Sequence, residues 1–248
     1  GADGMYASWD QLVAYYLTLG RESDRVQART IGTSTLGNPF LALTISSPEN
    51  LARAERFQEI ARLMADPRGL TEPQTDALAA EGRVVLLVSL GQHSTEVASS
   101  QVGPRLVHRL ATSNDERTRT ILDNAVLVLI PNFNPDGLVM VHDWVTQTAG
   151  TPHEGSRTPD LYHHYVGHDN NRDSFMLTQT ESKLWAQVAY QEWHPQIFKD
   201  THQMGSYGAR LFIPPKTDPI LPAVDPLVWR EMMLLGAGMA TRLEAEGV

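Results

Sequence analysis

The chain has 248 residues, 42% hydrophobic and 20% charged, so it can bury a core in one large α/β domain or two small ones. Its net charge of −9 would repel a phosphate backbone, and no run of Lys or Arg forms a basic stripe, so we expect no nucleic-acid partner. No apolar stretch approaches the roughly 20 residues needed to cross a bilayer, so we also expect no membrane span.

The chain contains no cysteine, which excludes a disulfide framework and a thiolate metal site. Any metal must therefore be held by carboxylates and by some of the nine histidines. The first four residues, Gly-Ala-Asp-Gly, do not resemble a native start, so a leader could have been removed before them. The location is not fixed by the sequence, and a secreted or periplasmic one is favoured.

The first third of the chain predicts a helix, a strand pair and further helices. Apolar residues at helical spacing between Ser8 and Leu19 predict an amphipathic helix that Ser8 caps. Short runs rich in Thr, Ile and Leu, separated by Gly and Pro, predict two strands joined by a turn between Val26 and Ile45. The Ala-, Arg- and Glu-rich stretch from Pro48 to Ala80 predicts helical pieces in an exposed insertion.

Three short apolar runs predict the buried strands of a sheet. They are Val84–Leu90, Ala125–Ile130 and Gln196–Phe198, each bounded by polar or turn residues. The helical pattern from Val97 to Leu110 supplies a crossover between parallel strands. The sequence therefore predicts an α/β fold, a three-layer α/β/α sandwich with a mixed, largely parallel sheet.

Two later segments complete the predicted organisation. Trp144 to Asp173 is rich in Thr, Pro, His, Gly and Asp without a period, which predicts a long irregular loop of the kind that often carries function. Pro226 to Glu246 has helix formers with apolar spacing and predicts a final helix. We interpret the whole chain, 1–248, as one catalytic domain.

A His-x-x-Glu pattern directly follows the first predicted core strand, at His93 and Glu96. Ligands of open α/β sheets bind beyond the carboxyl ends of strands, and this spacing across a loop-to-helix junction can aim an imidazole and a carboxylate at one point. Alone, the pattern is also compatible with a surface histidine beside a helix-capping glutamate.

A third ligand candidate, His202, ends another predicted strand. Two histidines and a glutamate would leave the fourth tetrahedral position of a zinc ion for water, and zinc can activate water and polarise a carbonyl. Hydrolysis is the chemistry that this set of residues favours. We interpret the remaining histidines as structural or solvent-facing, among them His108, His163, His164 and His194.

Two further motifs complete a recognisable series. Asn134-Pro135-Asp136-Gly137 follows the second core strand, and Asp169-Asn170-Asn171-Arg172 follows the long loop. In this order, His-x-x-Glu, Asn-Pro-Asp-Gly, Asp-x-Asn-Arg and a strand-terminal His resemble the zinc carboxypeptidase family related to carboxypeptidase A. The resemblance runs from about Ile31 onward.

The resemblance implies roles for individual residues. His93, Glu96 and His202 would bind zinc, and Asp169 would accept a hydrogen bond from the free ring nitrogen of His93. Asn171 and Arg172 would hold the terminal carboxylate of a substrate, for which the guanidinium offers a planar fork of donors. An ordinary surface ion pair is the alternative for Arg172. We interpret residues 134–137 as structural, with Asp136 holding backbone.

The sequence departs from the family pattern in two places. The family's Arg that polarises the scissile carbonyl has Arg157 as its one counterpart in the matching interval. The general base Glu and a closing Tyr would come several tens of residues after His202, beyond a final helix, and Glu244 and Glu246 lie on that helix. We therefore expect the general base to be absent from this chain, and the chain to be an inactive fragment, incomplete at its C-terminus.

The sequence as a whole predicts a zinc metallocarboxypeptidase that hydrolyses C-terminal residues of peptides. Its partner would be a peptide or an acyl-amino acid with a free carboxy terminus. Two alternatives stay open: a zinc amidase or deacylase on the same scaffold, acting on acyl-amino acids or cell-wall peptides, and a module that binds metal or carboxylate without catalysis.

Overall fold

The computed structural model describes residues 6–159, 169–205, 207, 211–215 and 222–247. The chain divides into two compact units, Gly1–Gln203 and Met204–Val248, which we describe separately. The interpretation of the chain as one catalytic domain stays a prediction. His163 and His164 lie outside the described residues.

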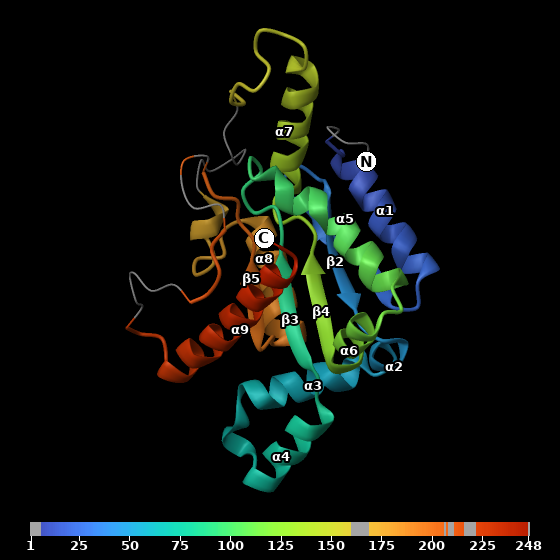
Figure 1. Cartoon of the computed structure of the whole chain (residues 1–248), viewed down its shortest axis with the longest axis vertical. Helices are drawn as coiled ribbons and strands as arrows, with labels where there is room; N and C mark the ends of the chain where they lie inside the picture. The colour runs from blue at the N-terminus through green and yellow to red at the C-terminus, as the bar shows by residue number, and fades with distance from the viewer. Residues whose placement is uncertain (1–5, 160–168, 206, 208–210, 216–221, 248) are drawn as a thin grey trace. The chain divides into compact units, whose positions relative to one another are not determined.

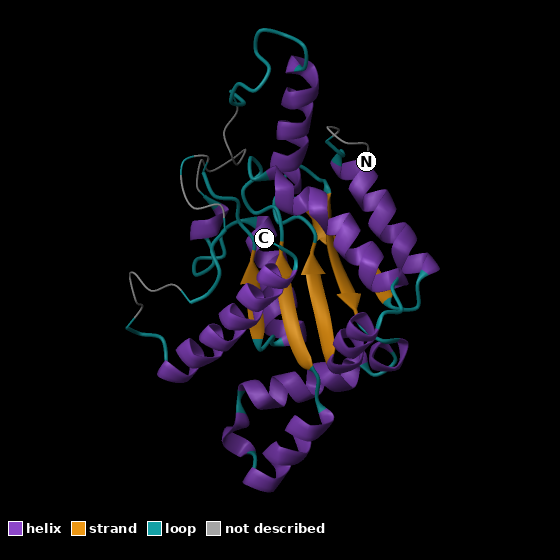
Figure 2. Ribbon diagram, in the orientation of Figure 1, coloured by secondary structure: helices purple, strands orange, loops and turns teal. Residues whose placement is uncertain are grey.

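A five-stranded mixed sheet forms the centre of the first unit (Figures 1 and 2). Its order is β1-β2-β4-β3-β5, with β1 at Val26–Thr33, β2 at Pro39–Ile45, β3 at Val84–Ser89, β4 at Ala125–Ile130 and β5 at Ile197–Asp200. The pairs β1–β2 and β2–β4 are antiparallel, whereas β3 pairs parallel with both β4 and β5. The predicted strand pair and the three predicted core strands are thus present.

Helices connect the strands of the first unit and cover its sheet, and the second unit contains a helix of its own. They are α1 (Trp9–Glu22), α2 (Pro48–Leu51), α3 (Ala54–Ala65), η1 (Pro67–Gly69), α4 (Glu72–Glu81), α5 (Val97–Thr112), α6 (Glu116–Asn124), α7 (Pro135–Thr148), η2 (Asn170–Arg172), α8 (Thr180–Ala186), the π-helix η3 (Gln187–Trp193) and, in the second unit, α9 (Pro226–Ala245). Ser8 caps α1 as predicted, accepting from Gln11 N. None of the helices in the described part of the chain is both long and apolar enough to cross a bilayer.

Alternation along the strands creates two apolar layers, one on each face of the sheet. Phe40 and Ala42 of β2 face a cluster formed with α3, α4, α8 and η3, whereas Leu41 and Leu43 face a cluster formed with α1, α5, α6 and α7. The three-layer α/β/α architecture with a mixed sheet is confirmed.

Two details of the predicted elements were wrong. The irregular loop expected from Trp144 begins later, because α7 continues to Thr148, with Leu138 and Val141 buried on its apolar side. The stretch 48–80 is not wholly an exposed insertion, because Phe57 and Ile60 of α3 are buried in the core. Both errors come from contacts with the sheet that a local composition count does not register.

The loop that leaves β3 turns sharply at Gly91. Its φ is +63°, and a Cβ at this position would lie 2.2 Å from Ser100 Oγ and 2.8 Å from Asn132 Nδ2. Only glycine combines this left-handed backbone with so close an approach of neighbouring side chains. The turn delivers His93 to the carboxyl end of the sheet.

The Asn-Pro-Asp-Gly motif begins α7. Asn134 caps the helix by accepting from Gly137 N at 2.9 Å, with Pro135 in the first turn. Asp136 accepts hydrogen bonds from Leu36 N at 2.8 Å and Asn38 Nδ2 at 2.7 Å, and also binds the Ser34 hydroxyl. The motif is therefore structural, as predicted, and ties α7 to the β1–β2 turn.

A buried carboxylate, Asp173, anchors the segment that carries η2. Its Oδ1 accepts from the Thr178 hydroxyl at 2.5 Å and its Oδ2 from Gln179 N at 2.9 Å. Burial raises the pKa of Asp173, but the hydrogen bonds from Thr178 and Gln179 outweigh it and lower the pKa to about 2. The ionised form is thus bound more strongly in the folded chain.

Replacing Asp173 by Asn should therefore destabilise the fold by about 1–3 kcal/mol at neutral pH, because an amide cannot accept at both positions. The folded pKa lies below the ordinary 3.8, so this contribution is present above pH 4 and is lost as the pH falls towards 2. Urea unfolding of Asp173→Asn and wild type from pH 7 to pH 2.5 measures this. The exposed Asp76→Asn is the matched control, and a stability gap that does not shrink in acid would contradict the account.

Candidate metal centre

Three residues singled out in the sequence meet at one edge of the sheet. His93 lies in the loop after β3, Glu96 is the N-cap residue of α5, and His202 follows β5. Because β3 and β5 are parallel neighbours, with Ser89 opposite Asp200, their carboxyl ends lie side by side. One ligand atom from each of the three side chains lies within 4.8 Å of the other two.

The Glu96 carboxylate bridges the Nδ1 atoms of the two imidazole rings, whose centroids lie 4.6 Å apart. His93 Nδ1 is 2.9 Å from Glu96 Oε1, and His202 Nδ1 is 3.0 Å from Glu96 Oε2. The backbone N–H of Gln203 also donates to Glu96 Oε2, at 2.8 Å. Both rings therefore direct the same nitrogen, Nδ1, at the shared carboxylate.

The opposite nitrogen of each ring also faces a carboxylate. His93 Nε2 lies 3.1 Å from Asp169 Oδ1, and His202 Nε2 lies 2.6 Å from Asp200 Oδ2. Asn171 Nδ2 is 3.2 Å from the same His202 nitrogen. A hydrogen bond at Nε2 fixes the tautomer and orientation of an imidazole whose Nδ1 is to bind a metal.

The electrostatics of the group favour ionised carboxylates. Burial raises the pKa of Glu96, but the N–H of Gln203 and the ring of His93 outweigh it, so the pKa lies below its ordinary value. Asp169 follows the same pattern, with Asn171 N and His93 as the stabilising donors. The hydrogen bond to Asp200 raises the pKa of His202 to about 8, so binding of a metal must displace a proton from this ring near neutral pH.

This donor set fits zinc. Two imidazole nitrogens and one carboxylate are the protein ligands of many catalytic zinc sites, and such sites keep a position open for solvent or substrate. His93 and Glu96 are half-buried, whereas His202 is more exposed. The group is thus reachable from outside while two of its members are fixed by the fold.

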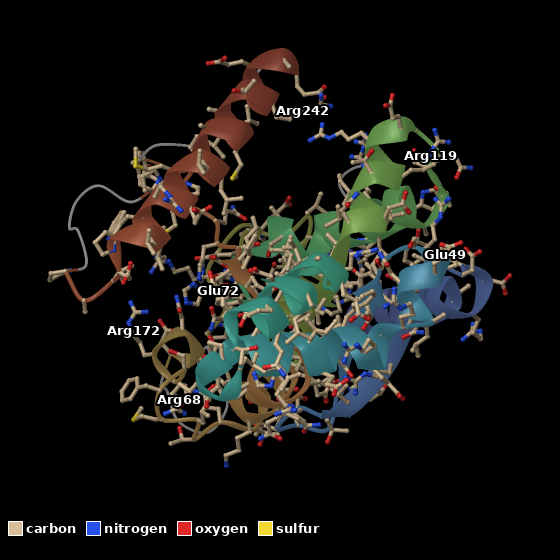
Figure 3. All side chains as sticks on the ribbon, turned by 90° about the horizontal axis from the view of Figure 1, so that it is seen from below. Glu49, Arg68, Glu72, Arg119, Arg172 and Arg242 are labelled. Atoms are coloured by element: carbon tan, nitrogen blue, oxygen red, sulfur yellow. The ribbon has the colours of Figure 1, made fainter. Side chains whose placement is uncertain are left out.

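The residues predicted to recognise a carboxylate lie in η2, beside this group. Asp169 caps η2 by accepting from Asn171 N, and the buried Asn170 donates to Gln92 O at 3.0 Å, in the loop that carries His93. Arg172 is exposed, and Figure 3 shows its labelled side chain projecting away from the ribbon. It forms no ion pair with any residue described in the structure.

Arg157 is not brought to the site by any contact with the described residues. It is exposed in the irregular segment after α7 and has no hydrogen bond or ion pair within the described ranges. Its role towards a scissile carbonyl stays a prediction.

Sequence reasoning missed Asp200 and Asn170. Asp200 precedes His202 by two positions, and a carboxylate at the last residue of a strand beside a candidate ligand was a usable signal. Asn170 was hidden inside the Asp-x-Asn-Arg motif as its variable position. Its buried hydrogen bond to the backbone of the His93 loop depends on tertiary contact alone.

The fold and the site define a class: an α/β protein whose sheet edge carries a His-Glu-His group suited to zinc. The chain belongs to the zinc carboxypeptidase family, whose sequence profile matches residues 12–207. Zinc is the metal of this family. No curated protein sequence matches the chain.

Several solved carboxypeptidase structures share the fold. Carboxypeptidase A from Helicoverpa armigera matches with a TM-score of 0.59 and 16% identity over 97% of this chain and 54% of that one. The metallo-carboxypeptidase from Burkholderia cenocepacia matches with a TM-score of 0.53 and 18% identity, over 80% of this chain and 42% of that one. The metallo-carboxypeptidase from Pseudomonas aeruginosa, in complex with (2-guanidinoethylmercapto)succinic acid, matches with a TM-score of 0.50 and 18% identity. The match covers 80% of this chain and 40% of that one. The chain thus spans about half the length of these structures.

We predict that the chain binds one zinc ion and that His93→Ala and His202→Ala abolish stoichiometric binding. Loss of a ligand should weaken affinity by more than the roughly 10–100-fold that loss of a supporting hydrogen bond causes. Metal analysis after dialysis, with competition by a chromogenic chelator, measures this. His108→Ala, on the exposed side of α5, is the matched control. Full zinc content in both site variants would show that the ligands lie elsewhere.

Proposed function

We propose that this chain carries the metal centre and the carboxylate-recognition residues of a zinc metallocarboxypeptidase, an enzyme that removes C-terminal residues from peptides. The observation that carries the proposal is the adjacency of the two groups: Asn171 Nδ2 lies 3.2 Å from His202 Nε2, beside the His-Glu-His group. A substrate carboxylate held at η2 would place the preceding peptide bond next to the metal centre.

We assign the metal and the substrate carboxylate to separate residues. His93, Glu96 and His202 would hold zinc, with Asp169 orienting His93. Zinc, when bound, would supply Lewis-acid polarisation of the scissile carbonyl and lower the pKa of water. Arg172 would bind the terminal carboxylate with two parallel N–H donors. It forms no ion pair with the described residues, and its Nη1 donates to Asn171 O at 3.1 Å, which leaves the other guanidinium donors for a substrate.

The related Pseudomonas aeruginosa enzyme supports a carboxylate-bearing ligand. It was solved with a substituted succinic acid, a dicarboxylate. By analogy, this chain should take peptides, or acyl-amino acids, with a free carboxy terminus. Preference between these two substrates separates a carboxypeptidase from an amidase or deacylase on the same scaffold.

The general base is the part of the reaction that the described site leaves unassigned. The described carboxylates that hydrogen-bond to the two imidazoles are Glu96, Asp169 and Asp200, and each is already engaged by a ring nitrogen. In the second unit, Glu246 pairs with Arg242 and Glu244 is exposed. We propose neither glutamate as the base.

The zinc-loaded chain should bind N-acetylphenylalanine more tightly than N-acetylphenylalaninamide, because only the free acid offers a carboxylate to Arg172. Arg172→Lys keeps the charge but loses the two-point fork, so affinity for the acid should fall roughly 10-fold or more. Isothermal titration calorimetry at equal zinc occupancy measures both.

Arg119→Lys, at an exposed position of α6, is the matched control and should bind like wild type. Equal affinity for the acid and the amide in the wild-type chain would remove the carboxypeptidase proposal and favour the amidase alternative.

We further predict that the zinc-loaded 248-residue chain hydrolyses a chromogenic carboxypeptidase substrate about 10²–10⁴-fold more slowly than a longer relative, such as the Burkholderia cenocepacia enzyme. General acid–base assistance is typically worth this factor, and the described residues supply no unengaged carboxylate at the imidazoles. Steady-state rates at equal zinc occupancy give the ratio.

Glu244→Gln and Glu246→Gln should leave the residual rate unchanged. Comparable turnover by the chain and the relative, with a loss in either variant, would identify Glu244 or Glu246 as the base and contradict the predicted absence of one.

A further inference from the structure

Asp200 is the last residue of β5 and is placed by the strand rather than by a loop. It pairs in register with Ser89 of β3, and the next residue continues the ladder, with Thr201 N donating to Ser89 O at 3.1 Å. Its Oδ2 lies 2.6 Å from His202 Nε2. The backbone on both sides of the carboxylate is therefore fixed independently of the imidazole.

The other oxygen of Asp200, Oδ1, makes no hydrogen bond with the described residues. This atom is also shielded from solvent. A half-buried carboxylate with one unsatisfied oxygen costs free energy unless a specific partner compensates it. Among the described contacts, the hydrogen bond that holds this carboxylate is the one between Oδ2 and His202.

Two groups compete for the same ring nitrogen. Asp200 can only accept a hydrogen bond at His202 Nε2, whereas the Asn171 amide nitrogen, at 3.2 Å, can only donate one. When Nε2 carries a proton, it donates a hydrogen bond to Asp200 and cannot accept one from Asn171. When Nε2 carries no proton, it can accept a hydrogen bond from Asn171 but cannot donate one to Asp200. The contact to Asp200 is shorter, at 2.6 Å, and charge-assisted, so it prevails.

We propose that Asp200 is the positioning residue for His202: it accepts a hydrogen bond from Nε2–H, so that the Nδ1 lone pair faces Glu96 and the metal, and it thereby releases the Asn171 amide for the substrate carboxylate. The proposal rests on the proposed function. With Asp169 at His93, it gives each imidazole of the centre its own supporting carboxylate, one from η2 and one from β5.

The inference predicts that Asp200→Asn weakens zinc binding by about 10–100-fold in the full chain, as loss of a supporting partner does at other metal sites. Asp169→Asn, which removes the corresponding partner of His93, should have an effect of similar size. Asp76→Asn, an exposed carboxylate of α4, should have none. Chelator competition gives the affinities.

A second readout separates positioning from mere structural support. In the zinc-loaded chain with ¹⁵N-labelled histidine, the proton on His202 Nε2, assigned by its through-space contacts with the neighbouring Asn171 side chain, should resonate far downfield in ¹H–¹⁵N spectra and should move upfield in Asp200→Asn. Thermal unfolding of the metal-free variants reports any loss of fold. A variant that loses zinc affinity and shifts this resonance while the metal-free melting temperature holds supports the proposal.

Unchanged affinity and an unmoved resonance in Asp200→Asn, with Asp169→Asn weakened as expected, would overturn the inference while leaving the metal centre intact. Absence of zinc binding by the wild-type chain would instead defeat the proposed function itself. A lowered melting temperature with unchanged zinc affinity would show that Asp200 serves the fold alone.

Discussion

The parallel pairing of β3 with β5 is the constraint on which the rest of the site depends. It brings the His-x-x-Glu segment after one strand beside the His after the other, although Glu96 and His202 are 106 positions apart in the chain. Parallel strands end at one edge, so polar residues that follow them converge there without a dedicated binding loop. A shift of this register would separate the ligands.

The hydrogen bonds around the two imidazoles fix the orientation of both rings through residues from separate parts of the chain. Each ring is held between Glu96 at Nδ1 and another carboxylate at Nε2, contributed by η2 for His93 and by β5 for His202. Such partners orient ligands and raise their basicity. The buried Asp173 in turn holds the segment that carries η2. A residue that stabilises the fold thus directly follows Arg172 in the chain.

Family membership and fold establish the architecture in which the metal centre lies. The chain belongs to the zinc carboxypeptidase family, yet identities of 16–18% to the solved relatives establish shared architecture alone. Arg172 and Asn171 supply the geometric argument for carboxylate recognition, because Arg172 forms no ion pair with the described residues and Asn171 adjoins the metal group.

The sequence by itself determined the core strands, the three candidate ligands and the family, because each leaves a local mark: an apolar run, a spaced His-x-x-Glu, an ordered set of motifs. The tertiary structure alone decided that α7 extends to Thr148, that Phe57 is buried, and that Asp200 and Asn171 meet at one nitrogen of His202. These features depend on contacts between residues far apart in the chain or on competition between donors, and neither leaves a periodic pattern in the sequence.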